Sequence, residues 1–119
     1  MPHVILNGSI SIEDVFNSLL PFTIHDENYV LRTLSKYINT EKTSILVEAL
    51  SIEKDGKIAF LVVLGNREDG LVIRIYPELD IKKTDGVKKI LAELAKQILQ
   101  KFPNLTIGKT NLQDFLSPT

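Results

Sequence analysis

Cysteine is absent from this chain of 119 residues. Its absence excludes disulfides, thiolate nucleophiles and thiolate metal ligands, and it fits a reducing compartment. Long hydrophobic runs are also missing, because no stretch approaches the roughly 20 apolar residues that a membrane-spanning helix needs. The first residues, Met1-Pro2-His3-Val4-Ile5, lack the basic start and long apolar region of a secretory signal. We therefore expect a cytoplasmic protein with no membrane segment.

The composition is close to average, with 44% hydrophobic and 24% charged residues. These proportions are typical of a folded soluble domain. A chain of 119 residues can bury one core but is short for two domains. We therefore predict a single domain over residues 1–119. The lysine, glutamate and isoleucine content is also compatible with a thermophilic source.

The most informative stretch is residues 44–76, where Asp55-Gly56 and Asp69-Gly70 separate three apolar segments. An Asp-Gly pair between two apolar runs is typical of a tight hairpin turn. The stretch therefore predicts an antiparallel three-stranded meander. If Asp55-Gly56 is a two-residue turn, Lys54 faces Lys57 and the pairing is mirrored along both strands.

The first hairpin of this meander is predicted to be apolar on both faces. One face carries Leu50, Ile52, Ala59, Leu61 and Val63, and the other carries Val47, Ala49, Ile58, Phe60, Val62 and Leu64. A sheet with one face in water alternates more cleanly than this. Both faces therefore need a cover, either helices on both sides or one helical layer plus a partner subunit.

The third segment does alternate, which favours a position near the edge of the sheet. Its two faces are Leu71, Ile73 and Ile75 on one side and Val72, Arg74 and Tyr76 on the other.

Helical signals lie on both sides of the meander. Ser11 can cap a first helix, which Pro21 ends. A second helix is predicted at residues 27–38, where apolar residues recur at helical spacing and Asp26 is the cap. The clearest amphipathic pattern follows Thr84 or Asp85 as the cap. Short strands are expected at residues 4–6 and 105–107.

Together these patterns predict an α+β fold. It consists of an antiparallel three-stranded meander plus short N- and C-terminal strands, with two N-terminal helices and one long C-terminal amphipathic helix packed on the sheet.

Glu48 stands out because it interrupts an otherwise apolar strand. A buried carboxylate costs several kcal/mol unless it is paired or protonated. Arg74, in the third strand, is the candidate partner, and the alternative is that both residues sit at an open edge or in a groove. A structural role is favoured over a functional one. With Tyr76 these residues form the candidate ligand pocket, which we expect between the sheet and the helices.

Two other clusters are weaker candidates. His25-Asp26-Glu27 combines groups that can do acid–base work or bind a metal, but two carboxylates at a helix N-terminus are explained by the helix dipole. Gly108-Lys109-Thr110 resembles the end of a phosphate-binding loop, but Pro103 stands where the first glycine is required. We therefore expect no cofactor and no metal.

Charge is distributed unevenly along the chain. Residues 1–81 contain 7 basic and 12 acidic residues, whereas residues 82–119 contain 7 basic and 3 acidic residues. The lysines that could line the exposed side of the long helix are Lys82, Lys83, Lys88, Lys89, Lys96 and Lys101. Clustered lysines can bind nucleic acid through phosphates. The net charge of −1 and the lack of arginine on this helix favour a solvated face instead.

No residue cluster has the types and spacing that a reaction demands. The sequence therefore favours a non-catalytic interaction or binding protein that self-associates, with a homodimer as the expected form and another protein as an alternative partner. Two alternatives stay open. One is a charge-driven nucleic-acid binder that uses the lysines. The other is a small-molecule binder or enzyme with a pocket around Glu48, Arg74 and Tyr76.

Overall fold

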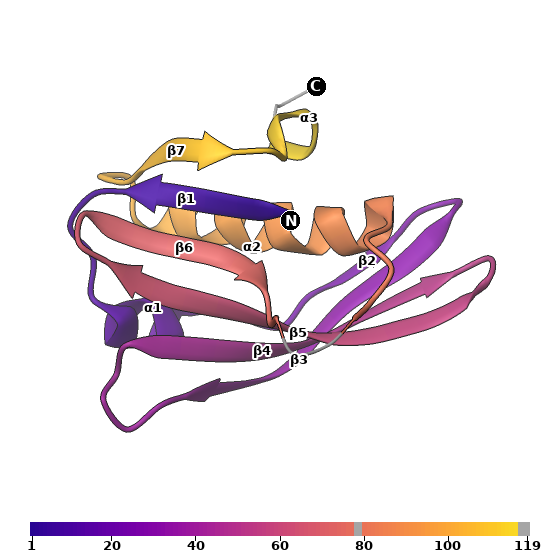
Figure 1. Ribbon diagram of the computed structural model, residues 1–119, viewed down its shortest axis with the longest axis horizontal. Coiled ribbons are helices and arrows are strands. Elements are labelled where there is room, and N and C mark those ends of the chain that lie inside the picture. The colour runs from indigo at the N-terminus through magenta and orange to yellow at the C-terminus, as the bar shows by residue number, and fades with distance from the viewer. Residues whose placement is uncertain (78–79, 117–119) are drawn as a thin grey trace.

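A computed structural model of the protein describes residues 1–77 and 80–116. Seven strands and three helices are present in these residues (Figure 1). In chain order they are β1 (His3–Asn7), α1 (Ile12–Ser18), β2 (Thr23–His25), β3 (Tyr29–Ile38), β4 (Ser44–Glu53), β5 (Gly56–Arg67), β6 (Gly70–Ile75), α2 (Asp85–Lys101), β7 (Thr106–Thr110) and α3 (Gln113–Leu116).

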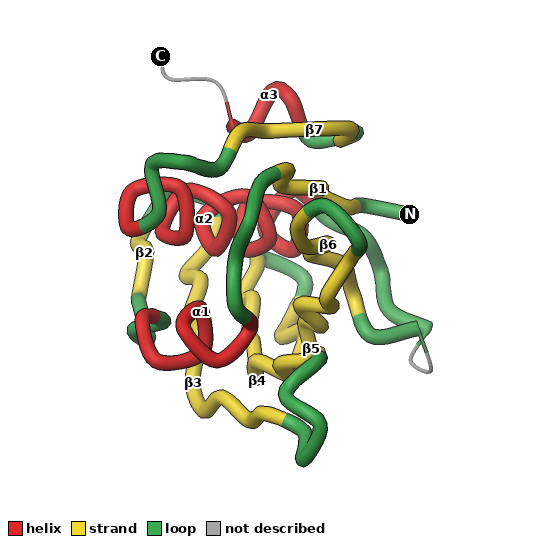
Figure 2. Tube along the Cα trace, turned by 90° about the vertical axis from the view of Figure 1, so that its left-hand side faces the viewer, coloured by secondary structure: helices red, strands yellow, loops and turns green. Residues whose placement is uncertain are grey.

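All seven strands belong to one antiparallel sheet with the order β2-β3-β4-β5-β6-β1-β7. Strands β2 to β6 are neighbours in the sheet in chain order. Strands β1 and β7, from the two ends of the chain, pair with each other and extend the sheet beyond β6. Figure 2 shows that the sheet curls into a half-barrel, with α1 and α2 inside the curl. In Figure 1 α2 passes behind β1 and β6.

The hydrophobic core lies between the inner face of the sheet and α2. The largest fully buried side chains come from most of the elements and include Leu6, Leu31, Ile45, Leu64, Leu71, Ile73, Ile90, Leu94 and Ile98. Thr84 caps α2, because its hydroxyl oxygen accepts a hydrogen bond from the Val87 amide at 3.2 Å. None of the helices in residues 1–77 and 80–116 is long and apolar enough to cross a membrane.

The predicted fold class is wrong. The structure is α+β, but its sheet has seven strands in place of a three-stranded meander with two short additions. One of the two expected N-terminal helices is missing, and the helices range from 4 to 17 residues.

The largest single error is the helix expected at residues 27–38, where the chain forms strand β3. Asp26 does not cap a helix. It lies in the turn between β2 and β3, where its carboxylate accepts from the Asn28 amide at 3.3 Å. Tyr, Val and Thr in this segment favour a strand, and pairing with β4 at residues 29–33 and 36–38 outweighs the helical spacing.

The register of the central hairpin differs from the predicted one by two residues. Glu53 pairs with Gly56, and Ile52 pairs with Lys57, so the two-residue loop is Lys54-Asp55. Gly56 is the first residue of β5 and has φ +133°, a conformation that favours glycine. Because side chains alternate with a period of two, an even shift leaves each residue on its predicted face.

β6 is not near the edge of the sheet, as its alternation suggested, because β1 and then β7 extend the sheet beyond it. The helices also lie on one face only. Lys36, on the inner face of β3, donates to the Phe16 carbonyl of α1, and Gly86 of α2 approaches Ser51 of β4. The described residues therefore have a single helical layer, as in the second of the two predicted arrangements, whose partner subunit stays a prediction.

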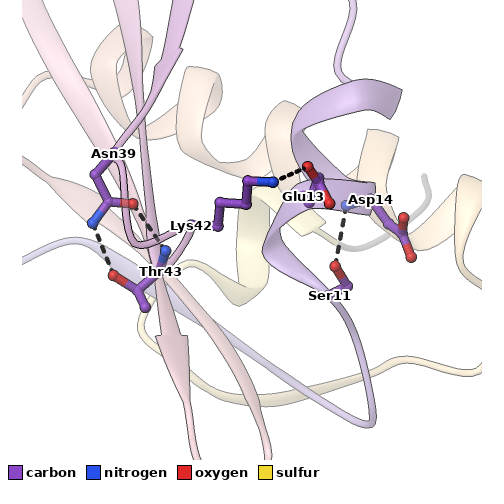
Figure 3. A network of polar contacts seen from close by, with 6 residues as sticks. All are labelled: Ser11, Glu13, Asp14, Asn39, Lys42 and Thr43. Atoms are coloured by element: carbon purple, nitrogen blue, oxygen red, sulfur yellow. Dashed lines mark hydrogen bonds and ion pairs between the residues drawn. The ribbon is translucent and has the colours of Figure 1, made fainter.

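The turn between β3 and β4 is held by Asn39 and connected to α1 (Figure 3). The Asn39 carbonyl oxygen accepts from the Thr43 and Ser44 amides at 2.8 and 2.9 Å, and its amide group donates to the Thr43 hydroxyl at 2.8 Å. Lys42 in this turn forms an ion pair of 2.7 Å with Glu13, and Ser11 caps α1 by accepting from the Asp14 amide. These contacts fix the turn against the helix.

Candidate functional site

The outer face of the sheet is the candidate site. We define it by the side chains that point away from α1 and α2 in the middle of the sheet, which are Leu46, Glu48, Leu50 and Ile52 of β4, Ala59, Leu61 and Val63 of β5, Arg74 of β6 and Tyr76 just after it. Most of them are apolar, and Ile52 retains 37% of its accessible surface. Among the described helices, none packs on this face.

Cross-strand pairing arranges these side chains in rows. Glu48 lies opposite Leu61, and the Tyr76 amide donates to the Leu61 carbonyl at 2.8 Å. In the neighbouring row Val63 lies between Leu46 and Arg74. The two charged residues therefore flank an apolar centre on β5, with Glu48 on one side and Arg74 on the other.

Glu48 is held by a tyrosine. The Tyr37 hydroxyl donates to Oε1 of Glu48 at 2.5 Å, and this hydrogen bond raises the pKa of the Tyr37 phenol above its usual value of 10.0. Oε2 of Glu48 has no hydrogen-bond partner among residues 1–77 and 80–116. One carboxylate oxygen is thus available for a further contact.

Arg74 does not pair with Glu48 within the described residues, so of the two predicted arrangements the ion pair is wrong, and Arg74 lines an open groove instead. The two residues are on strands separated by β5, and the ion pairs within the described part of the chain involve other side chains. Arg74 is exposed, and in that same part no carboxylate lies within ion-pair distance of it. Its guanidinium is a free cation at the rim of an apolar surface.

A groove of about 440 Å³ opens beside Arg74. It is lined by Tyr37, Ile38, Asn39, Ser44, Leu46, Val63, Arg74, Tyr76 and Pro77. Two of the three predicted pocket residues, Arg74 and Tyr76, therefore line one groove, and Glu48 adjoins it through Tyr37. The groove lies on the outer face and not between the sheet and the helices, because its lining includes the outer-face side chains Leu46, Val63 and Arg74.

Tyr37 is the residue that the sequence analysis missed. It is 52% exposed and reaches the outer face because the pairing of β3 with β4 shifts between Thr33 and Lys36. The bulge contains one extra residue, because Leu34 and Ser35 of β3 together oppose the single residue Glu48 of β4. The alternation of residues 29–33 was a usable strand signal, but nothing in the sequence marks the position of the bulge.

The two weaker clusters have structural roles or none. His25, Asp26 and Glu27 are exposed at the turn between β2 and β3. Within the described ranges, no group of three or more histidines and carboxylates could hold a metal ion. Thr110, the last residue of Gly108-Lys109-Thr110, donates to the His3 carbonyl at 2.7 Å and accepts from the Leu112 amide at 3.0 Å. This segment is an edge strand, not a phosphate-binding loop.

The lysines do not form one uninterrupted basic face. Lys89 and Lys96 both lie within ion-pair distance of Glu93, at 3.1 and 3.3 Å. Lys88 is half-buried, whereas Lys82 and Lys83 are exposed in the segment that precedes α2. Because Glu93 offsets part of the charge in the middle of the helix, the electrostatic attraction for phosphates is reduced.

The fold and the site define a class: an α+β protein with a single antiparallel sheet, helices on its inner face and an apolar outer face bordered by opposite charges. Comparison with protein-family models, curated proteins and solved structures gives no match for this chain.

Proposed function

We propose that this protein is a non-catalytic cytoplasmic binding protein that self-associates through the outer face of its sheet. The observation that carries the proposal is a set of apolar side chains on the outer face that no described helix covers and that keep accessible surface: Leu46, Leu50, Ile52, Ala59 and Leu61. Sheets with two apolar faces are normally covered on both. In a chain whose helices occupy the inner face, a second copy can supply that cover.

The dimensions are suitable for an ordinary interface. A stable protein–protein contact takes about 800 Å² from each partner, and the chain exposes 6966 Å². About a tenth of the surface therefore suffices. The composition of the outer face is also compatible with an interface, because most of its side chains are apolar and Tyr37, Tyr76 and Arg74 belong to residue types that are enriched at interfaces.

Sedimentation velocity over a range of protein concentrations tests the proposal. We expect a dimer that dissociates when Ala59, which is exposed on the outer face, is replaced by arginine. Ala59→Arg adds bulk and charge without removing a buried side chain. The matched control is Asn17→Arg, which adds the same side chain on the exposed surface of α1. A wild-type chain that stays monomeric at high concentration contradicts the proposal.

The groove beside Arg74 supports a second candidate function, the binding of a small organic anion with an apolar body. Arg74 supplies the cation, and Tyr37 and Tyr76 in the lining supply aromatic surface. Native mass spectrometry of the purified protein distinguishes the two candidates. A bound mass that disappears in Arg74→Gln favours the ligand, whereas a ligand-free dimer favours self-association.

The nucleic-acid alternative is not favoured, because Glu93 partly neutralises the lysines of α2. A nucleic-acid role requires an affinity that falls steeply with salt and is lost when Lys88, Lys89 and Lys96 are neutralised. We expect neither in a filter-binding assay.

A further inference from the structure

We propose that the partner on the outer face is a second copy of the chain in a two-fold arrangement, in which Arg74 of each subunit pairs with Glu48 of the partner subunit. This inference rests on the proposed self-association and specifies its symmetry and its register. Glu48 and Arg74 are charged residues of opposite sign on the outer face, and the contacts within one subunit leave both incompletely paired.

The placement of these charges is fixed by the strand register. Glu48 lies opposite Leu61, and Arg74 lies opposite Val63, so the midpoint between the two charged residues falls on β5 between Leu61 and Val63. Strands lie about 4.8 Å apart, and successive residues on one face are about 6.8 Å apart, which separates the two positions by roughly 12 Å. This distance is too long for an ion pair within one subunit.

A two-fold axis can exchange the two positions. When the axis lies in the interface, crosses this midpoint and runs at right angles to the line from Glu48 to Arg74, each Arg74 faces Glu48 of the partner subunit. Contacts of this kind occur in pairs, because an isologous interface uses the same patch twice. The apolar residues Leu61 and Val63 then lie beside the axis, with an ion pair on each side.

The local contacts prepare both groups for this pairing. Tyr37 holds Oε1 of Glu48 and thereby orients the carboxylate, while Oε2 stays available. Arg74 has no carboxylate partner among the described residues and can donate two parallel hydrogen bonds to a carboxylate. Such charge complementarity favours a second copy over an unrelated apolar partner, since the same face carries both signs.

Charge reversal tests the register. Glu48→Arg puts arginine at both of the positions that the two-fold axis exchanges, and Arg74→Glu puts glutamate at both. We expect each variant alone to weaken self-association by at least about tenfold, because like charges then face each other twice. An equimolar mixture of the two variants should form a mixed dimer, and the double variant E48R/R74E should recover the homodimer, since opposite charges again meet in both cases.

The measurements are sedimentation velocity for affinity and native mass spectrometry for the composition of the mixed dimer. Lys101→Glu is the control, because it reverses a positive charge at an exposed position of α2, away from the outer face. Tyr37→Phe separates loss of the Tyr37–Glu48 hydrogen bond from loss of the charge. Circular dichroism establishes that each variant is folded.

The outcomes separate the inference from the proposed function. If the wild type dimerises and both single variants dimerise equally well, the Arg74–Glu48 register is wrong but self-association is not contradicted. Single variants that stay monomeric when mixed also overturn the register. A wild-type chain that is monomeric throughout overturns the proposed function and this inference together.

Discussion

Gly86, in the first turn of α2, lies directly against Ser51 on the inner face of β4. A Cβ atom added at Gly86 would collide with the Ser51 hydroxyl oxygen and would lie 2.7 Å from Oε2 of Glu53. The same Glu53 oxygen accepts hydrogen bonds from Ser51 and from the cap residue Thr84, each at 2.5 Å. The start of the helix is therefore packed against the sheet without room for a side chain.

Gly86→Ala is expected to lower the free energy of unfolding by about 1–3 kcal/mol, because the added methyl group forces α2 away from β4. The measurement is chemical denaturation followed by circular dichroism. Gly65→Ala is the matched control, since its Cβ would lie 3.7 Å from Val72, an ordinary contact distance. Equal stability of the two variants would show that α2 adjusts without cost.

The pKa of Tyr37 offers a pH-dependent test of the outer face. The hydrogen bond to Glu48 raises this pKa in the folded protein, so the folded state keeps the phenol proton longer than the unfolded state does. The resulting stabilisation is present below pH 10 and is lost as the pH rises through the raised pKa. Glu48→Gln should move the titration of Tyr37 down toward 10.

Tyrosinate absorbance measures this titration, and the difference between the wild type and Tyr37→Phe isolates Tyr37. Glu41→Gln, at an exposed position in the turn between β3 and β4, is the control and should leave the titration unchanged. A midpoint that is the same in the wild type and in Glu48→Gln contradicts the role of the Glu48 hydrogen bond.

Lys36 connects β3 to the end of α1. Its amine donates to the carbonyls of Phe16 and Leu19 at 2.5 and 3.0 Å and lies 4.6 Å from the centre of the Phe16 ring. Because these carbonyls have no partner within the helix, Lys36→Met should cost about 1–3 kcal/mol of stability. Urea denaturation measures the loss. Lys54→Met, at an exposed position in the hairpin loop, should change stability little.

Asn39 is expected to matter more for stability than the ion pair beside it. Asn39→Ala removes three hydrogen bonds from the turn between β3 and β4, which should cost about 1–2 kcal/mol. Glu13→Gln breaks the Lys42–Glu13 ion pair, but both side chains are about half exposed, so the effect should be close to zero. Thermal unfolding of the two variants compares them, and a larger loss in Glu13→Gln would reverse this order.

Part of the architecture follows from local sequence. Thr84 caps α2 because its hydroxyl can accept from the Val87 amide three residues later. The Asp-Gly pairs mark the two turns of the central strands because glycine adopts a positive φ at low cost. Side chains on β4 and β5 alternate between the two faces with a period of two. The predicted faces are therefore correct, although the predicted register differs from the observed one by two residues.

The candidate site required the tertiary structure. Glu48, Arg74 and Tyr76 could be named from the sequence, but the groove that joins Arg74 and Tyr76 also depends on Tyr37, whose segment was predicted to be helical. The bulge at Leu34 and Ser35 that directs Tyr37 to the outer face has no local signature.

The sequence by itself determined the cap of α2, the two turns and the two apolar faces, since each depends on residues only a few positions apart. The tertiary structure decided that residues 29–38 form a strand, that β1 and β7 place β6 in the interior, and that both α1 and α2 occupy one face. These features depend on contacts between residues far apart in the chain, where hydrogen bonding between strands and burial outweigh local preference.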